Sequence, residues 1–194
     1  MTNKDETRWE FRCWPCDVSP LWAQIEREYV RHDEERRTDT YFLSSARKDL
    51  MPKLRGGDRF EIKQLMETRD ALEKWSLPIS VPSPLVKADA ERIAVFFKDI
   101  SAERLTGCGG EQLEVLFGSI CHTHRVEKHR ALFTLGDLQA ELTAARAHGS
   151  IAFSVGFECE DAETLHTEHH RLGLSAFENI AYFEALEARR IFAA

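Results

Sequence analysis

The chain has 194 residues, a formal net charge of -7 at pH 7 and a composition that is 43% hydrophobic and 30% charged. This length fits one domain, and the apolar content distinguishes the chain from an intrinsically disordered one. The negative net charge argues against general nucleic-acid binding, which needs a basic surface, but it allows a local basic pocket. No apolar run reaches the roughly 20 residues of a membrane span, so we expect no membrane partner. The five unevenly spaced cysteines and the polar N-terminus predict a cytoplasmic protein.

In the first half of the chain, strand patterns surround one helix. The spacing predicts a strand over Thr7–Trp14, and Ser19 and Pro20 then begin an amphipathic helix. The charge run Arg31–Arg37 is expected to be a solvated helix end or loop. Gly56, Gly57 and Asp58 suit a hairpin turn, because glycine tolerates a positive φ. Three further strands are expected at Thr38–Ser44, Leu50–Arg55 and Arg59–Met66.

The second half mixes both kinds of element. Ser76–Pro84 contains three prolines and is expected to be an extended connector, whereas Ala88–Phe97 and Leu138–Ala147 have helical character. The remainder to Arg190 is expected to be mostly helix. Strands are predicted at Gln112–Ile120, His124–Thr134 and Ser150–Glu160. The pattern predicts an α+β fold with about seven strands, mostly antiparallel.

Charged residues recur two positions apart within the expected strands. Residues i and i+2 of a strand point to the same face of the sheet, so each pair places two charges on one side. Apolar residues such as Phe11 and Ile62 then face the other way. Because both signs recur from end to end, the pairs predict a polar cavity lined by the segments Arg8–Arg12, Lys53–Arg55, Glu61–Lys63, Lys128–Arg130 and Glu158–Glu160.

The order of these pairs resembles that of the CYTH superfamily, the triphosphate tunnel metalloenzymes, which include class IV adenylyl cyclases, thiamine triphosphatases and inorganic triphosphatases. The segments that carry the resemblance also include Asp39-Thr-Tyr41-Phe42 and Asp137. The resemblance implies a closed antiparallel β-barrel of about eight strands with flanking helices around a charged tunnel. It implies one CYTH-like domain over 1–194, with a barrel core over about 6–161 and a helical region over about 162–194.

The resemblance also implies roles for individual residues in binding a triphosphate or another phosphorylated ligand. Basic side chains would bind phosphate oxygens, and carboxylates would hold Mg²⁺ or Mn²⁺. The preferred reaction is metal-dependent triphosphate hydrolysis, ahead of adenylyl cyclase activity. The substrate-binding residues would be Arg12, Lys53, Arg55, Lys63, Lys128 and Arg130; the metal ligands would be Glu10, Glu158 and Glu160; and Glu61 would pair with neighbouring bases.

Arg8 is a departure from the family pattern, because it stands where the first signature glutamate is expected, and Arg12 replaces the signature lysine. A register that starts at Glu6 places Arg8 at the second signature position instead, which agrees less well. A positive charge at a metal ligand's place repels the metal. The alternative function is therefore a non-catalytic protein that binds a polyphosphate or nucleotide. The oligomeric state is left open, with a homodimer as one option.

Other clusters of chemically active residues are weaker signals. Cys13 and Cys16 form a Cys-x-x-Cys motif without the βαβ context of a thioredoxin-like site, so packing is the favoured interpretation and redox chemistry the alternative. Two groups that contain histidines are interpreted as polar surface, and metal binding is the less favoured alternative for each. They are Cys121 with His122 and His124, and His166 with His169 and His170.

Overall fold

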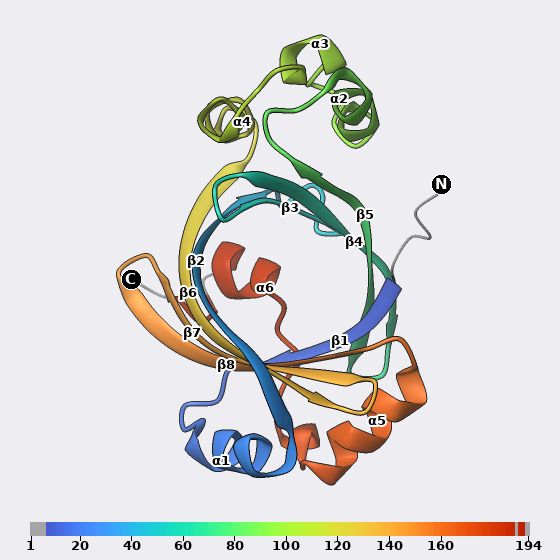
Figure 1. Cartoon of the computed structure of the whole chain (residues 1–194), viewed down its shortest axis with the longest axis vertical. Helices are drawn as coiled ribbons and strands as arrows, with labels where there is room; N and C mark the ends of the chain where they lie inside the picture. The colour runs from blue at the N-terminus through green and yellow to red at the C-terminus, as the bar shows by residue number, and fades with distance from the viewer. Residues whose placement is uncertain (1–6, 189, 193–194) are drawn as a thin grey trace.

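A computed structural model describes residues 7–188 and 190–192 of the chain, so Glu6 and the other residues of the N-terminal end lie outside the described residues. Eight antiparallel strands close into a barrel in the order β1-β5-β4-β3-β2-β6-β7-β8, which confirms the predicted barrel (Figure 1). The strands are β1 (Thr7–Cys13), β2 (Val30–Leu43), β3 (Leu50–Arg55), β4 (Arg59–Arg69), β5 (Leu72–Pro82), β6 (His122–Leu135), β7 (Leu138–Ala147) and β8 (Ser150–Cys159). Within this described part, no helix has the length and apolar character of a membrane span.

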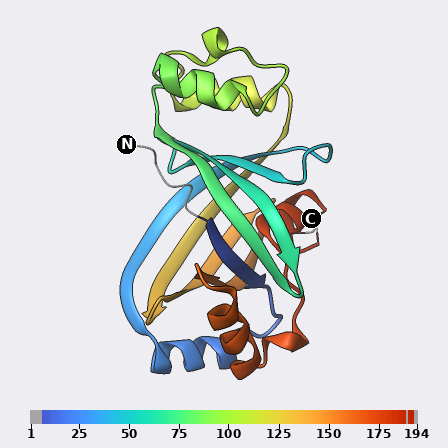
Figure 2. The same ribbon diagram turned by 90° about the vertical axis from the view of Figure 1, so that its right-hand side faces the viewer.

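The outer face of the barrel wall is apolar on two sides and is covered by helices. On one side, α1 (Ser19–Glu28) and α5 (Ala162–Arg171) pack on β1 and β8, where Phe11 and Phe157 are each 1% exposed. On the opposite side lie α2 (Lys87–Ala94), α3 (Ala102–Leu105) and α4 (Gly110–Gly118), as Figure 2 shows. Their apolar faces cover the outer residues of β3, β4 and β5. Because strand side chains alternate, the charged partners of these residues point into the barrel.

The short helix α6 (Tyr182–Glu187), which follows η1 (Leu174–Ala176), lies inside the ring of strands and fills one end of it (Figure 1). The segment before α6 is held to β1: Ile180 N donates to Arg12 O at 2.8 Å, and Trp14 Nε1 donates to Ile180 O at 2.9 Å. Tyr182 stacks on Tyr41 of β2, with ring centroids 5.3 Å apart. The barrel is therefore a cup that is closed at one end by the chain's own C-terminal region.

Two predicted elements have the wrong type. Leu138–Ala147 was expected to be a helix because its residues favour helices, but it is strand β7, paired on both edges with β6 and β8. Pairing in the closed barrel overrides its local preference. Gln112–Ile120 was expected to be a strand, but most of it lies in α4. There Leu113, Leu116 and Phe117 are spaced to bury one helical face.

Two segments expected outside the sheet lie within it. Arg31–Arg37 is part of β2, where long pairing with β6 orders the charge run. Most of Ser76–Pro84 belongs to β5. Pro78 lies where the register between β4 and β5 shifts, and Pro82 is at the strand's end, so neither proline interrupts a regular central ladder.

Candidate functional site

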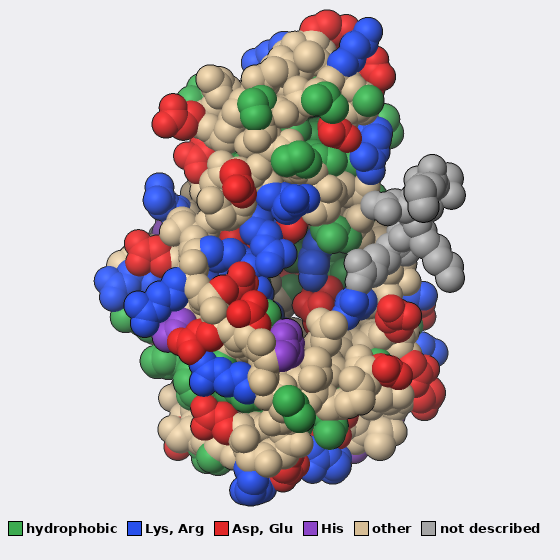
Figure 3. All heavy atoms as spheres, in the orientation of Figure 1, with side chains coloured by type: hydrophobic (Ala, Val, Ile, Leu, Met, Phe, Trp, Pro, Cys, Tyr) green, Lys and Arg blue, Asp and Glu red, His purple; other side chains and the backbone are tan. Residues whose placement is uncertain are grey.

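The inner faces of the strands enclose a cavity of about 320 Å³, which is within the usual ~300–1,000 Å³ of small-molecule sites. In Figure 3 the cavity is a hollow on the face that looks down the barrel, with Lys and Arg side chains gathered in it. A smaller inner space of about 60 Å³ shares several of its residues and reaches Tyr182 of α6. The cavity therefore extends from an open mouth to the closed end.

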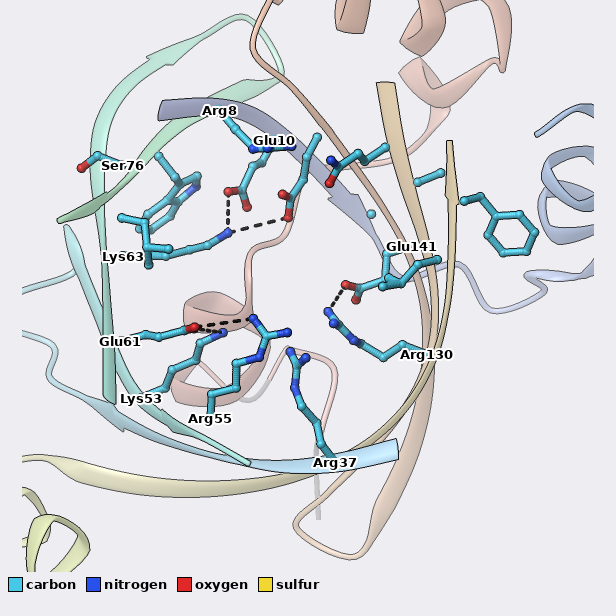
Figure 4. A pocket seen from close by; sticks show the side chains of 18 of the residues that line it. Arg8, Glu10, Arg37, Lys53, Arg55, Glu61, Lys63, Ser76, Arg130 and Glu141 are labelled. Carbon is cyan, nitrogen blue, oxygen red and sulfur yellow. Dashed lines mark hydrogen bonds and ion pairs between the residues drawn. The ribbon is translucent and has the colours of Figure 1, made fainter. Parts of the chain in front are cut away.

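The first charged group lies on β2, β3 and β4 around Lys53. Lys53 Nζ lies 3.1 Å from Glu61 Oε2 and Arg55 Nη1 lies 3.5 Å from Glu61 Oε1, as Figure 4 shows. Asp39 is fully buried and accepts from Arg37 Nε at 2.9 Å, and it pairs with Lys128 Nζ at 3.1 Å. Burial by itself raises the pKa of Asp39, but the charges of Lys128, Lys53 and Arg37 hold that pKa well below its ordinary value.

The second group crosses β1, β7 and β6. Arg12 Nη2 lies 3.1 Å from Glu141 Oε1, and Arg130 pairs with the other oxygen of the same carboxylate. Arg12 Nη1 also donates to Ser154 Oγ at 2.8 Å. Burial opposes the charged form of Glu141, yet Arg12 and Arg130 lower its pKa well below the ordinary value. Glu141 therefore stays ionised between two guanidinium groups.

The third group contains Glu10, Glu158 and Lys63, on β1, β8 and β4. Glu10 and Glu158 are direct partners on adjacent strands. Lys63 Nζ lies 2.5 Å from Glu10 Oε1 and 3.7 Å from Glu158 Oε1, so one ammonium group bridges both carboxylates (Figure 4). Burial lowers the pKa of Lys63, but the two glutamates outweigh it and hold that pKa above the ordinary value. Arg8, two residues before Glu10, also lines the cavity.

Glu73 is the direct partner of Glu10 on the other side of β1. It accepts from Trp75 Nε1 at 3.0 Å. Burial, and then the charges of Glu184 and Glu10, raise the pKa of Glu73 to about 7, against the lowering effect of the Trp75 hydrogen bond. Glu73 does not line the cavity, so it is a partly buried carboxyl beside the site.

The structure brings most of the sequence-predicted residues together. Glu160 is the exception, because it lies beyond the last residue of β8, is exposed and does not line the cavity. Asp137 is likewise exposed, in the turn between β6 and β7. The predicted residues that line the larger space are Glu10, Lys53, Arg55, Glu61, Lys63, Arg130 and Glu158, and those that line only the inner space are Arg12 and Lys128.

Sequence reasoning assigned no role to Arg37, Glu141 or Tyr182, all of which line these spaces. The sequence predicts a solvated helix end or loop at Arg37, although with Asp39 it continues the every-second-residue pattern of an inward strand face. Glu141 was placed on a helix, although polar Gln139, Glu141 and Thr143 alternate with apolar residues as a strand would. Tyr182 has no comparable signal, because its position depends on how α6 folds back into the barrel.

The carboxylates of the cavity do not fit a divalent cation in this arrangement. Mg²⁺ and Mn²⁺ need several carboxylate oxygens directed at one point. Glu10 and Glu158 direct theirs at Lys63, and Glu160 is outside the cavity. Among residues 7–188 and 190–192, no group of three or more His, Cys, Asp or Glu side chains is arranged to hold a metal ion. The residues present therefore form ion pairs with the protein's own cations.

The cysteine and histidine clusters lie away from the cavity lining. Cys13 and Cys16 are free thiols, and burial raises the pKa of Cys13 to about 12, which disfavours the reactive thiolate. His166 Nε2 and His170 Nε2 are 3.1 Å apart on the exposed face of α5. His169, by contrast, is buried and packs edge-on against Phe11, so it does not belong to the expected polar surface. At the α6 end, Glu187 contacts His122 and His124, at 2.5 and 3.0 Å.

A closed barrel with charged residues on its inner wall defines a β-barrel protein with a charged internal cavity. No family model and no curated protein matches the chain. A protein of Pyrococcus horikoshii has a similar structure, with a TM-score of 0.58, 14% identity and coverage of 91% of this chain and 98% of that chain. A conserved hypothetical protein of Pyrococcus furiosus is also similar, with a TM-score of 0.59 and 12% identity over 91% of this chain and 98% of that chain.

An adenylyl cyclase candidate from Hippeastrum, described as having a dominant triphosphatase activity, has a TM-score of 0.56 and 10% identity over 96% of this chain and 97% of that chain. These similarities extend over nearly the whole chain. They confirm the fold expected from the sequence, a closed antiparallel β-barrel with flanking helices. Identities this low show the fold, and they leave the activity to be argued from the residues of the cavity.

Proposed function

We propose that the cavity binds a triphosphate or another small molecule with several phosphate groups. The observation that carries this proposal is a set of cationic side chains that come from different strands and point into one cavity. They are Arg8, Arg37, Lys53, Arg55, Lys63 and Arg130 around the larger part, and Arg12 and Lys128 around the inner part. Arginine binds phosphate oxygens in bidentate fashion, and lysine binds them as a compact charge.

The ion pairs inside the cavity favour a ligand with several charges over one with a single charge. The cations just named include Arg130, Lys53 and Lys63, which already contact Glu141, Glu61 and Glu10. A ligand must therefore compete with these carboxylates for the same donors. A chain of phosphates supplies many oxygens at once and can replace several partners in a single binding event, so its interactions reinforce each other.

The resemblance to the triphosphate tunnel metalloenzymes favours hydrolysis of the bound triphosphate, with Mg²⁺ or Mn²⁺ as the cofactor. The protein would act in the cytoplasm. The triphosphatase activity named for the Hippeastrum neighbour supports hydrolysis. The second candidate is a protein that binds the ligand without hydrolysing it. Arg8 and the bridging position of Lys63 favour this candidate, because both put positive charge where a metal would act.

Thermal-shift measurements with inorganic triphosphate, ATP and thiamine triphosphate test the binding proposal. We expect stabilisation of the wild-type protein and its loss in the double variant Lys53→Ala with Arg55→Ala. The matched control is Lys87→Ala with Arg125→Ala, which removes the same charge from two exposed positions outside the cavity. An equal ligand shift in both double variants would show that the cavity is not the binding site.

Phosphate release from the same three compounds, with and without Mg²⁺ or Mn²⁺, separates the two candidates. Metal-dependent release that is lost in the Lys53 and Arg55 double variant supports hydrolysis. Ligand stabilisation without release under any of these conditions supports binding alone.

A further inference from the structure

We propose that Lys63 and Arg8 supply the positive charge that a divalent cation would otherwise bring to Glu10 and Glu158, so that the cavity binds its phosphorylated ligand without a metal ion. This inference rests on the proposed phosphate-binding function and specifies how the same site is neutralised. It reverses the metal requirement expected from the sequence.

The backbone places the two carboxylates and the ammonium group together. Glu10 and Glu158 are opposite each other on the adjacent strands β1 and β8, with both side chains lining the cavity. Lys63 comes from β4, which is separated from β1 by β5, and it reaches across at the point where the register of β4 against β5 shifts. Its Nζ lies 2.5 Å from Glu10 and 3.7 Å from Glu158. The ammonium group therefore occupies the side of both carboxylates on which a shared metal ion would bind.

Metal binding at this pair would place a divalent cation beside two protein cations. A divalent ion repels each of these positive charges twice as strongly as a monovalent ion would at the same distance. Moving Lys63 aside would leave its ammonium group without the partners that now hold it charged. Arg8 on the same face of β1 adds to the repulsion.

Among residues 7–188 and 190–192, the remaining carboxylates in and beside the cavity offer no alternative pair. Glu141 lies between Arg12 and Arg130, and Glu61 contacts Lys53 and Arg55. Asp39 is held by Arg37, Lys53 and Lys128. Glu73 is next to Glu10 in the sheet, but it accepts from Trp75 and does not line the cavity. Each carboxylate that lines the cavity thus has a cationic partner from the protein itself.

The first test measures metal binding alone, without any phosphate compound. Mn²⁺ is titrated into the protein, and the free Mn²⁺ signal is followed by electron paramagnetic resonance. We expect no binding by the wild-type protein up to about 1 mM Mn²⁺. The double variant Arg8→Glu with Lys63→Gln should bind Mn²⁺ at least about tenfold more tightly. The exposed pair Arg125→Glu with Lys87→Gln makes the same charge change and should behave as the wild type. Saturable Mn²⁺ binding by the wild type would overturn the inference.

The second test titrates inorganic tripolyphosphate calorimetrically, once with EDTA and once with Mg²⁺, and each titration is corrected by the same injections into buffer. We expect the wild type to bind tripolyphosphate in EDTA, and we expect its apparent affinity not to increase in Mg²⁺, because Mg²⁺ binds the oxygens of the free tripolyphosphate. Binding by the wild type only with Mg²⁺ would overturn the inference and leave the proposed function intact. Absence of binding in both conditions would overturn the proposed function, and the inference with it. The Mn²⁺ and tripolyphosphate titrations of the wild type test the inference even if the variants fail to fold.

Discussion

Arg12 of β1 lies 3.1 Å from Glu141 of β7, although strand β8 separates their backbones. Gly156 of β8 is the direct partner of both residues. A Cβ atom at Gly156 would come within 2.6 Å of Arg12 Nη2. The missing side chain therefore makes the space through which Arg12 reaches its carboxylate, and one glycine sets the position of a cation inside the cavity.

We predict that Gly156→Ala moves Arg12 away from Glu141 without unfolding the barrel, because the atoms in the way belong to the end of a flexible side chain. The expected loss of unfolding free energy is about 1–2 kcal/mol, as for other overpacked sites. Chemical denaturation of Gly156→Ala, Glu141→Gln and the double variant measures it. The double variant should lose less than the sum of the two single losses, since both remove the same ion pair. Simple additivity would show that Gly156 does not act through this pair.

Glu141→Gln should lower the stability of the ligand-free protein and increase its stabilisation by tripolyphosphate. Removing the carboxylate leaves Arg12 and Arg130 with fewer anionic partners, at a cost of about 3 kcal/mol. Each guanidinium group then has one carboxylate fewer that competes with phosphate, although Arg130 still pairs with Glu35. Thermal melts with and without tripolyphosphate check both effects. A ligand shift smaller than that of the wild type would mean that Glu141 assists binding instead of competing with it.

The stability of the protein should depend on the ionisation of Glu73. Its pKa rises from 4.5 to about 7 in the folded state, so the folded protein binds this proton more tightly than the unfolded chain. The resulting stabilisation is present at low pH and is lost as the pH rises through about 7. Glu73→Gln should match the wild-type melting temperature at pH 4, below the unfolded-state pKa of 4.5, and exceed it at pH 8.5 by about 5–10 °C. The exposed control Glu67→Gln should show no such pH dependence, and an equal effect of both variants would contradict the prediction.

The ring of Tyr182, and not its hydroxyl group, should matter for the closed end of the barrel. Lys128 Nζ lies 3.8 Å from the ring centroid and Arg12 Cζ lies 5.0 Å from it, whereas the buried hydroxyl has no hydrogen-bond partner in the described residues. Tyr182→Phe should therefore change the unfolding free energy by less than about 1 kcal/mol. Tyr182→Leu should cost about 2 kcal/mol, because it loses the stacking and cation–π contacts. Equal losses in the two variants would assign the effect to the hydroxyl group.

The strand pairs with charges two residues apart were predictable because their alternation is local. Lys53 with Arg55, and Glu61 with Lys63, lie on the strands where the sequence placed them, and their side chains line the cavity. Glu141 was missed because Leu138–Ala147 has helix-favouring residues, and only pairing with β6 and β8 makes it a strand. Arg37 was missed because a run of charges resembles a solvated loop until β6 pairs with it.

By itself, the sequence determined that several strands have one apolar and one charged face, since the two-residue period of a strand is written directly in the residue order. The barrel was expected only from the family resemblance. The tertiary structure alone decided which charges meet. Lys63 bridges Glu10 and Glu158 because barrel closure brings three separate strands to one space, and Arg12 reaches Glu141 because Gly156 lies between them. The return of α6 into the barrel likewise closes one end of the cavity. Ion pairs depend on distance in space, and spacing along the chain does not encode that distance.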